Sequence, residues 1–282
     1  MLESSMTEPN WHELQYNPRA TVANASEIIP AWKIRADQTR KRFAFDADIS
    51  YGPHSREVVD FYRAPNTKGT IIYIHGGYWR LLSKVETSWV ADGFVGQGIS
   101  VALINYPLCP DVSLGDIRGS IIRAFVHLYK NVPNDDERAN IVVAGHSAGG
   151  HLAALHLATD WTEHGLPENP VAGVIAISGI YDVAPLMHTT MNADIRITEE
   201  MAPALNLMTA KVKSRAQILL AVGGDEPSEF HRQAADLAKA WASLHPKILS
   251  LPNTNHFTVV DSFADPAGEL NKIALAMLSR RF

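Results

Sequence analysis

The sequence of 282 residues contains one cysteine, Cys109, no surplus of basic residues and no long apolar run. A single cysteine cannot form an intrachain disulfide, which favours a reducing compartment. The formal net charge of −5 argues against charge-driven binding to nucleic acid, because such binding needs excess lysine and arginine at the phosphates. No apolar run reaches the ~18 residues of a membrane span, and the polar N-terminus does not resemble a signal peptide. We therefore expect a cytoplasmic protein that binds neither nucleic acid nor membrane.

Sequence motifs for metals and nucleotide cofactors are also missing. The chain has no H-E-x-x-H zinc motif, no phosphate-binding loop and no glycine fingerprint of a dinucleotide site. His146, His151 and His156 are spaced by five residues, which separates successive side chains by about 140° around a helix. Those histidines should therefore not converge on one ion. We expect neither a metal nor a cofactor.

The alternation of short apolar runs with helical segments predicts the fold class. Hydrophobic residues make up 46% of the chain, as in an ordinary globular protein. The predicted strands are 57–62, 70–74, 100–105, 141–144, 172–177, 218–222 and 248–251, and the helices between them lie near 84–97, 114–130, 148–160 and 228–244. Strands regularly separated by helices indicate an α/β protein whose mostly parallel twisted sheet is flanked by helices. We expect a single domain over residues 1–282.

Three segments lie outside this alternation. Residues 1–42 are interpreted as a polar N-terminal arm followed by a helix over 30–42, with Pro30 in its first turn. Residues 181–215 contain prolines, methionines and scattered polar residues, and are interpreted as a small cap-like insertion over the active site. At the C-terminus, Asp265 and Pro266 are predicted to cap and open a last helix over 266–280.

The pentapeptide GHSAG at 145–149 is the strongest chemical signal in the chain. The pattern G-x-S-x-G between a strand and a helix is typical of a nucleophile elbow, which presents the serine on a sharp turn. Bulky residues at positions 145 and 149 would clash in that turn, and the serine lies at the positive end of the following helix. The structural alternative is a glycine-rich turn that packs a helix onto a strand. The predicted strand and helix on either side favour Ser147 as a nucleophile.

The second signal is HGGYW at 75–79, directly after a predicted buried strand. Consecutive glycines, Gly76 and Gly77, let the main chain approach a substrate carbonyl closely. The backbone N–H groups of Gly77, Tyr78 and Ala148 can then stabilise an oxyanion. Alone, the motif would favour a tight turn with a structural histidine. Its position about 70 residues before the serine motif favours an oxyanion hole.

A nucleophilic serine also needs a base, which in this arrangement follows the acid near the C-terminus. Among the 12 histidines, His256 lies between the predicted strand 248–251 and the last helix. The other late histidines, His231 and His245, fall within or at the end of a predicted helix. Position therefore singles out His256.

The acid partner has more than one candidate. Asp225 and Glu226 both follow the predicted strand 218–222, and either could orient His256. Glu226 could instead interact with the first turn of the next helix. Asp182, which follows the preceding strand, is a weaker third candidate. The residues alone leave the choice open.

Together, these motifs resemble the α/β-hydrolase type of kynurenine formamidase, or arylformamidase. The residues that carry the resemblance are QYNPR at 15–19, HGGYW at 75–79, GHSAGGHL at 145–152, DW at 160–161, SGIYD at 178–182, EFHRQ at 229–233 and NHF at 255–257. The glycine and serine motifs are shared with hormone-sensitive-lipase-like esterases. The resemblance implies the α/β-hydrolase fold and hydrolysis of N-formyl-kynurenine to kynurenine and formate. It also implies that the acid lies at Glu226, where an aspartate is usual.

The substrate expected from the resemblance is a small aromatic amide or ester, with Trp79 and Trp161 as candidate pocket residues beside Tyr78. One alternative is a carboxylesterase or amidase that acts on another small acyl aromatic or cyclic amide. A different class is a ligand-binding protein of this fold without catalysis. A homodimer is compatible with the sequence, which does not determine the oligomeric state.

Overall fold

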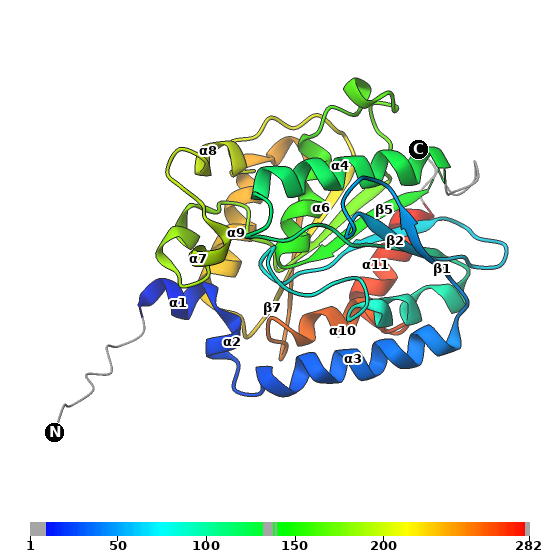
Figure 1. Cartoon of the computed structure of the whole chain (residues 1–282), viewed down its shortest axis with the longest axis horizontal. Coiled ribbons are helices and arrows are strands. Elements are labelled where there is room, and N and C mark those ends of the chain that lie inside the picture. The colour runs from blue at the N-terminus through cyan, green and yellow to red at the C-terminus, as the bar shows by residue number, and fades with distance from the viewer. Residues whose placement is uncertain (1–9, 132–137, 139, 280–282) are drawn as a thin grey trace.

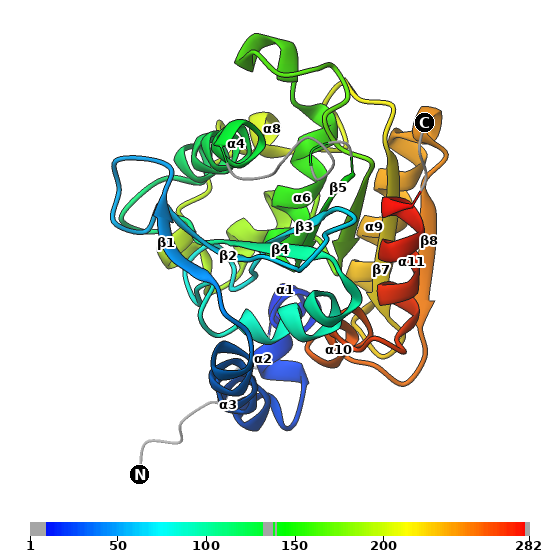
Figure 2. The same ribbon diagram turned by 90° about the vertical axis from the view of Figure 1, so that its right-hand side faces the viewer.

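An eight-stranded sheet forms the centre of the computed structural model, which describes residues 10–131, 138 and 140–279 (Figures 1 and 2). The strand order is β1-β2-β4-β3-β5-β6-β7-β8. The strands are β1 (Asp46–Ser50), β2 (Val58–Tyr62), β3 (Thr70–Ile74), β4 (Ser100–Ile104), β5 (Ile141–His146), β6 (Gly173–Ile177), β7 (Gln217–Gly223) and β8 (Lys247–Leu251). β2 pairs antiparallel with β1 and β4, and the remaining pairs are parallel.

Helices cover both faces of the sheet. Their bounds are α1 (Trp11–Tyr16), α2 (Pro18–Thr21), α3 (Ala25–Arg42), α4 (Leu114–Asn131), α6 (Ala148–Ala158), α7 (Asn192–Ile195), α8 (Ala202–Leu205), α9 (Ser228–Ala240), α10 (Asp261–Ala264) and α11 (Glu269–Leu278). Side chains of α4, α6 and α9 belong to the core on one face, and those of α3, α10 and α11 to the core on the other. Figure 1 shows α4 and α3 on opposite sides of the sheet. The predicted mostly parallel sheet between helices is therefore confirmed.

Burial explains which strands the sequence pattern could identify. Every residue of β3, β4, β5 and β6 is buried, because helices cover both faces of a parallel sheet and select continuous apolar runs. The edge strand β1 was not predicted. Its sequence, DADIS, is largely exposed and has no apolar run, and its place in the sheet depends on pairing with β2.

Three predicted helices differ from the structure. α3 begins at Ala25, so Pro30 lies inside the helix. α11 begins at Glu269 after Gly268, and the Asp265 side chain instead accepts a hydrogen bond from the Ala267 N–H. The helix predicted near 84–97 consists of two 3-10 segments, η1 (Ser88–Gly93) and η2 (Val95–Gln97).

The N-terminal arm from residue 10 onward forms α1 and α2 and lies against the rest of the chain. The amide of Asn10 donates to the backbone oxygen of His188, and the Thr190 N–H donates to the Glu13 carboxylate. These partners belong to residues 181–215, which contain η4 (Ala184–His188), α7 and α8. The arm and this insertion therefore pack together. Residues 1–9 of the predicted arm lie outside the described residues.

Candidate active site

Ser147 lies on the turn between β5 and α6 with φ 56° and ψ −120°. Its backbone N–H donates to the oxygen of Ile177 at 2.8 Å. A Cβ at Gly145 would overlap the backbone oxygen of Gly149, and a Cβ at Gly149 would overlap the backbone oxygen of Ile74. Both glycines are therefore required sterically where the chain turns this sharply.

His256 follows β8 and contacts a buried carboxylate. Its Nδ1 lies 2.6 Å from Oε2 of Glu226. Oε1 of Glu226 accepts hydrogen bonds from the Gly223 N–H at 2.7 Å and from the hydroxyl of Ser178. Because a carboxylate can only accept, Nδ1 carries the proton and Nε2 is left as the basic nitrogen.

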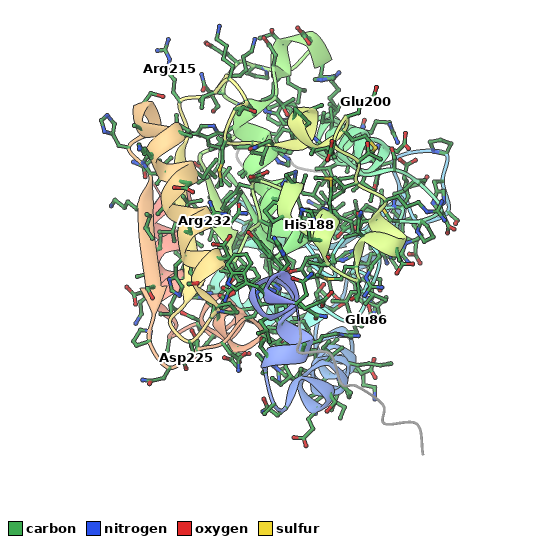
Figure 3. All side chains as sticks on the ribbon, turned by 90° about the vertical axis from the view of Figure 1, so that its left-hand side faces the viewer. Glu86, His188, Glu200, Arg215, Asp225 and Arg232 are labelled. Atoms are coloured by element: carbon green, nitrogen blue, oxygen red, sulfur yellow. The ribbon has the colours of Figure 1, made fainter. Side chains whose placement is uncertain are left out.

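The other two acid candidates lie elsewhere. Asp225 is exposed (Figure 3), and its backbone N–H donates to the oxygen of Thr254. The Asp182 carboxylate accepts from the N–H of Ala184 at 3.1 Å, within its own turn. Of the three candidate acids, the structure brings Glu226 to His256.

Ser147 and His256 line one cavity and are 2% and 3% exposed. The parallel order of the strands accounts for this, because Ser147 follows β5, Glu226 follows β7 and His256 follows β8. The carboxyl ends of parallel strands meet at one edge of a sheet, where ligands bind in open α/β folds. Residues more than 100 positions apart in sequence (147 and 256) thus share a site.

His146, the second residue of the serine motif, supports His256. Its Nε2 donates to the backbone oxygen of His256 at 2.7 Å, and the two ring centroids are 4.7 Å apart. Burial, together with the neighbouring His256, holds the pKa of His146 well below its usual value, so the ring is neutral. From the sequence, His146 is a candidate only for a metal ligand, and no pattern in the sequence indicates this contact.

The loop after β3 has an unusual backbone. Gly77, Tyr78 and Trp79 have φ values of 104°, 50° and 55°. A Cβ at Gly76 would lie 2.8 Å from the backbone oxygen of His146, so the loop packs closely on the serine turn. Within the described part of the chain, the backbone N–H groups of Gly77, Tyr78 and Ala148 have no hydrogen-bond acceptor.

His75 supports this loop from inside the core. Its ring stacks on Tyr106 with centroids 4.2 Å apart, and its Nδ1 donates to the backbone oxygen of Gly76 at 2.8 Å. The Tyr106 hydroxyl donates to the backbone oxygen of His75 at 2.9 Å. Burial lowers the pKa of His75 to about 3. His75 is therefore a neutral structural residue.

The remaining cavity wall comes from the arm, α3 and the insertion. It includes Asn17, Pro18 and Arg19 of the arm, Ile29 and Trp32 of α3, Met191 of the insertion, Arg80, Leu81 and Leu82 after the glycine loop, and Phe257. Among the described residues that line it, Arg19 and Arg80 are the arginines, and none is a carboxylate. Arg80 forms an ion pair with Asp194 of α7.

The two predicted substrate-binding tryptophans do not line this cavity. Trp79 is fully buried, and its ring meets the edge of His151 at a centroid distance of 5.5 Å. Trp161 packs on Phe125 at 4.4 Å, beyond the end of α6 that is opposite Ser147. Both large rings fill core space. Trp32, which no sequence motif indicates, provides the indole ring at the cavity.

The described residues contain no group of three or more His, Cys, Asp or Glu side chains that could hold a metal ion. Nor do they contain a helix of the length and apolarity needed to cross a membrane.

Comparisons with known proteins identify relatives of this chain. Residues 59–223 match the BD-FAE family. The kynurenine formamidase of Salmo salar is 31% identical over 83% of this chain and 82% of its own length. That of Danio rerio is 30% identical over 95% and 96%.

Solved structures show the same architecture. A proposed thioesterase from Silicibacter sp. TM1040 is 30% identical, with a TM-score of 0.84 over 93% of this chain and 99% of that chain. The Pyrobaculum calidifontis esterase has a TM-score of 0.69 at 17% identity, over 95% and 96%. The predicted α/β-hydrolase fold is thereby confirmed.

Proposed function

The chain belongs to the kynurenine formamidase family of hydrolases, and from this we propose that it cleaves N-formyl-kynurenine to kynurenine and formate through Ser147, His256 and Glu226. One observation carries the proposal. A single cavity brings together a serine on a strained turn and a histidine bonded to a buried carboxylate. Three backbone N–H groups without acceptors in the described chain belong to the same turn and the adjacent glycine loop.

In the first half of the reaction, Oγ of Ser147 attacks the formyl carbon and Nε2 of His256 takes the hydroxyl proton. The N–H groups of Gly77, Tyr78 and Ala148 stabilise the oxyanion. The C–N bond then breaks, and His256 returns the proton to the leaving arylamine. The product of this half is a formyl ester on Ser147.

In the second half, water attacks the formyl ester while His256 again accepts a proton. The ester bond breaks, formate leaves and Ser147 recovers its hydrogen from His256. Glu226 stays ionised throughout and stabilises the imidazolium. Hydrogen bonds from Gly223 and Ser178 to the other carboxylate oxygen hold this glutamate in position, where the family usually has the shorter aspartate.

The cavity wall also fits this substrate. Ile29, Trp32 and Phe257 offer apolar surface for an aromatic ring. Arg19 and Arg80 offer positive charge for the carboxylate that N-formyl-kynurenine carries. Arg19 has no ion pair within residues 10–131, 138 and 140–279.

A rate comparison tests the substrate class. We expect kcat/KM for N-formyl-kynurenine to exceed that for p-nitrophenyl acetate by a large factor. A preference for the ester would favour a carboxylesterase. Failure of an organophosphate to label Ser147 would instead favour a non-catalytic ligand-binding protein.

A further inference from the structure

Tyr78 connects the glycine loop to the N-terminal arm. Its side chain is buried, and its hydroxyl donates to the backbone oxygen of Tyr16 at the end of α1. The backbone N–H of the same Tyr78 is one of the proposed oxyanion donors. One residue therefore combines a proposed oxyanion donor with a side-chain bond to a segment 62 residues earlier.

Tyr16 is in turn fixed to α9. It is fully buried, and its hydroxyl donates to the Glu229 carboxylate. Arg232 binds both oxygens of that carboxylate, at 2.8 and 2.7 Å. Burial and the bond to Glu229 raise the pKa of Tyr16 to about 12, so the phenol keeps its proton. The Gln15 side chain adds a second attachment by accepting from the Glu229 N–H at 3.3 Å.

The first turn of α9 also contacts the catalytic base. The ring centroid of Phe230 lies 4.7 Å from that of His256, and Glu226 lies on the loop that leads into α9. Figure 3 looks onto the side of the molecule where α1 lies, with Arg232 of α9 and His188 of the insertion labelled. The arm therefore joins the helix beside His256 to the loop that holds the oxyanion donors.

We propose that Tyr16 and Tyr78 are positioning residues that hold the oxyanion loop in register with His256 and Glu226. The inference rests on the proposed function. Positive φ values at Tyr78 and Trp79 are unfavourable for residues with a Cβ, so the loop needs contacts elsewhere to keep its shape. An oxyanion donor works only within hydrogen-bond distance of the developing charge, which makes small displacements of this loop costly for the rate.

The proposal also explains two motifs that the catalytic triad leaves without a role. QYNPR at 15–19 supplies Gln15 and Tyr16, and EFHRQ at 229–233 supplies Glu229, Phe230 and Arg232. These residues contact each other across more than 200 positions of sequence. The two motifs form one structural unit beside the active site.

Replacing Tyr78 with phenylalanine tests this idea because it removes only the hydroxyl. We expect kcat for N-formyl-kynurenine to fall about 10-fold with KM changed less than about 2-fold, since loss of a whole donor costs about 10²–10³ in kcat. Binding of phenylboronic acid, whose serine adduct places an oxygen in the oxyanion hole, should weaken by a similar factor. Binding of the product kynurenine should not change.

Tyr73→Phe is the matched control. Tyr73 is buried in β3, directly before the same loop, but stacks on Phe263 in the opposite core. It should keep wild-type kcat. Tyr16→Phe, which removes the bond to Glu229, should lower kcat in the same direction as Tyr78→Phe and provides the test if that variant does not fold.

The proposal is overturned if folded Tyr78→Phe and Tyr16→Phe keep wild-type kcat and phenylboronic acid affinity. It is also overturned if Tyr73→Phe loses as much kcat as they do. Failure of the proposed function looks different, because either the wild type would then show little activity on N-formyl-kynurenine or Ser147→Ala would remain active, whatever the tyrosine variants do.

Discussion

Ser147 and its two flanking glycines show how closely single residues are constrained at this site. The serine adopts a positive φ, and each glycine approaches a backbone oxygen so closely that a side chain would overlap it. Such conformations persist only where surrounding contacts enforce them. Substitutions at these positions should therefore change the free energy of unfolding measurably.

Gly149→Ala should destabilise the fold. Its new methyl group would overlap the backbone oxygen of Ile74 at the end of β3, and we expect a loss of about 3 kcal/mol in the free energy of unfolding. Gly96→Ala is the control, because a Cβ there meets no atom within 4 Å. Urea denaturation of both variants measures the difference, and equal stabilities would contradict the packing described for the serine turn.

Replacing each of the two neighbouring acids by its amide, one at a time, should give unequal losses of kcat. Glu226→Gln keeps the side-chain size but removes the charge facing His256, so kcat should fall about 10³- to 10⁴-fold. Asp225→Asn alters an exposed side chain and should change kcat less than about 2-fold. Steady-state kinetics at constant pH distinguish them. Equal, mild losses in both variants would shift the role of acid to Asp182.

At the scale of elements, the arm completes a cavity that the sheet begins. Asn17, Pro18 and Arg19 form part of its wall, and Trp32 of α3 supplies an aromatic ring. The loops at the carboxyl ends of the strands carry the proposed catalytic residues. The N-terminal segments and the insertion provide much of the surface that a substrate would meet.

Arg19→Met tests the contribution of the arm to substrate choice. Loss of this positive charge should raise KM for N-formyl-kynurenine about 3- to 10-fold, because an exposed arginine contributes modestly to carboxylate binding. KM for formanilide, which lacks a carboxylate, should rise less. Arg19→Lys, which keeps the charge, should recover part of the affinity. An equal rise for both substrates would contradict a role in carboxylate binding.

Some strands and cavity residues could be predicted from the sequence, and others could not. β3 and β5 were predictable because burial on both faces selects continuous apolar runs, and the motifs that follow them locate Ser147 and the glycine loop. β1 was not, since its exposed residues carry no such pattern. The need for an aromatic pocket makes Trp161 a candidate in the sequence, yet in the structure it packs on Phe125. Which aromatic rings reach a cavity depends on tertiary packing, which local spacing does not encode.

On the scale of the whole molecule, two apolar cores enclose the sheet and several histidines. His75, His146, His151 and His156 are buried. Burial lowers the pKa of His75 and His151 to about 3 and that of His156 to about 4. In the unfolded chain the same groups titrate near their usual value of about 6.5. Between the lowered pKa values of about 3 to 4 and the unfolded value of about 6.5, the folded protein therefore binds fewer protons than the unfolded chain.

The free energy of unfolding should consequently decrease as the pH falls below about 6.5. The contribution of the neutral buried histidines is complete above about pH 6.5 and is lost as the pH falls toward 3 to 4. Each should account for about 1–2 kcal/mol between pH 6.5 and pH 5. Urea denaturation across this range measures the slope, which His156→Gln should reduce. A free energy of unfolding that stays constant from pH 6.5 to pH 5 would contradict the prediction.

The most direct test of the whole account is the kcat of Ser147→Ala on N-formyl-kynurenine, measured on protein whose circular dichroism and unfolding midpoint match the wild type. We expect a fall of at least about 10⁴-fold, because the hydroxyl that attacks the formyl group is gone. A folded variant that retains activity within about 10-fold of the wild type would show that the hydrolysis does not proceed through this serine.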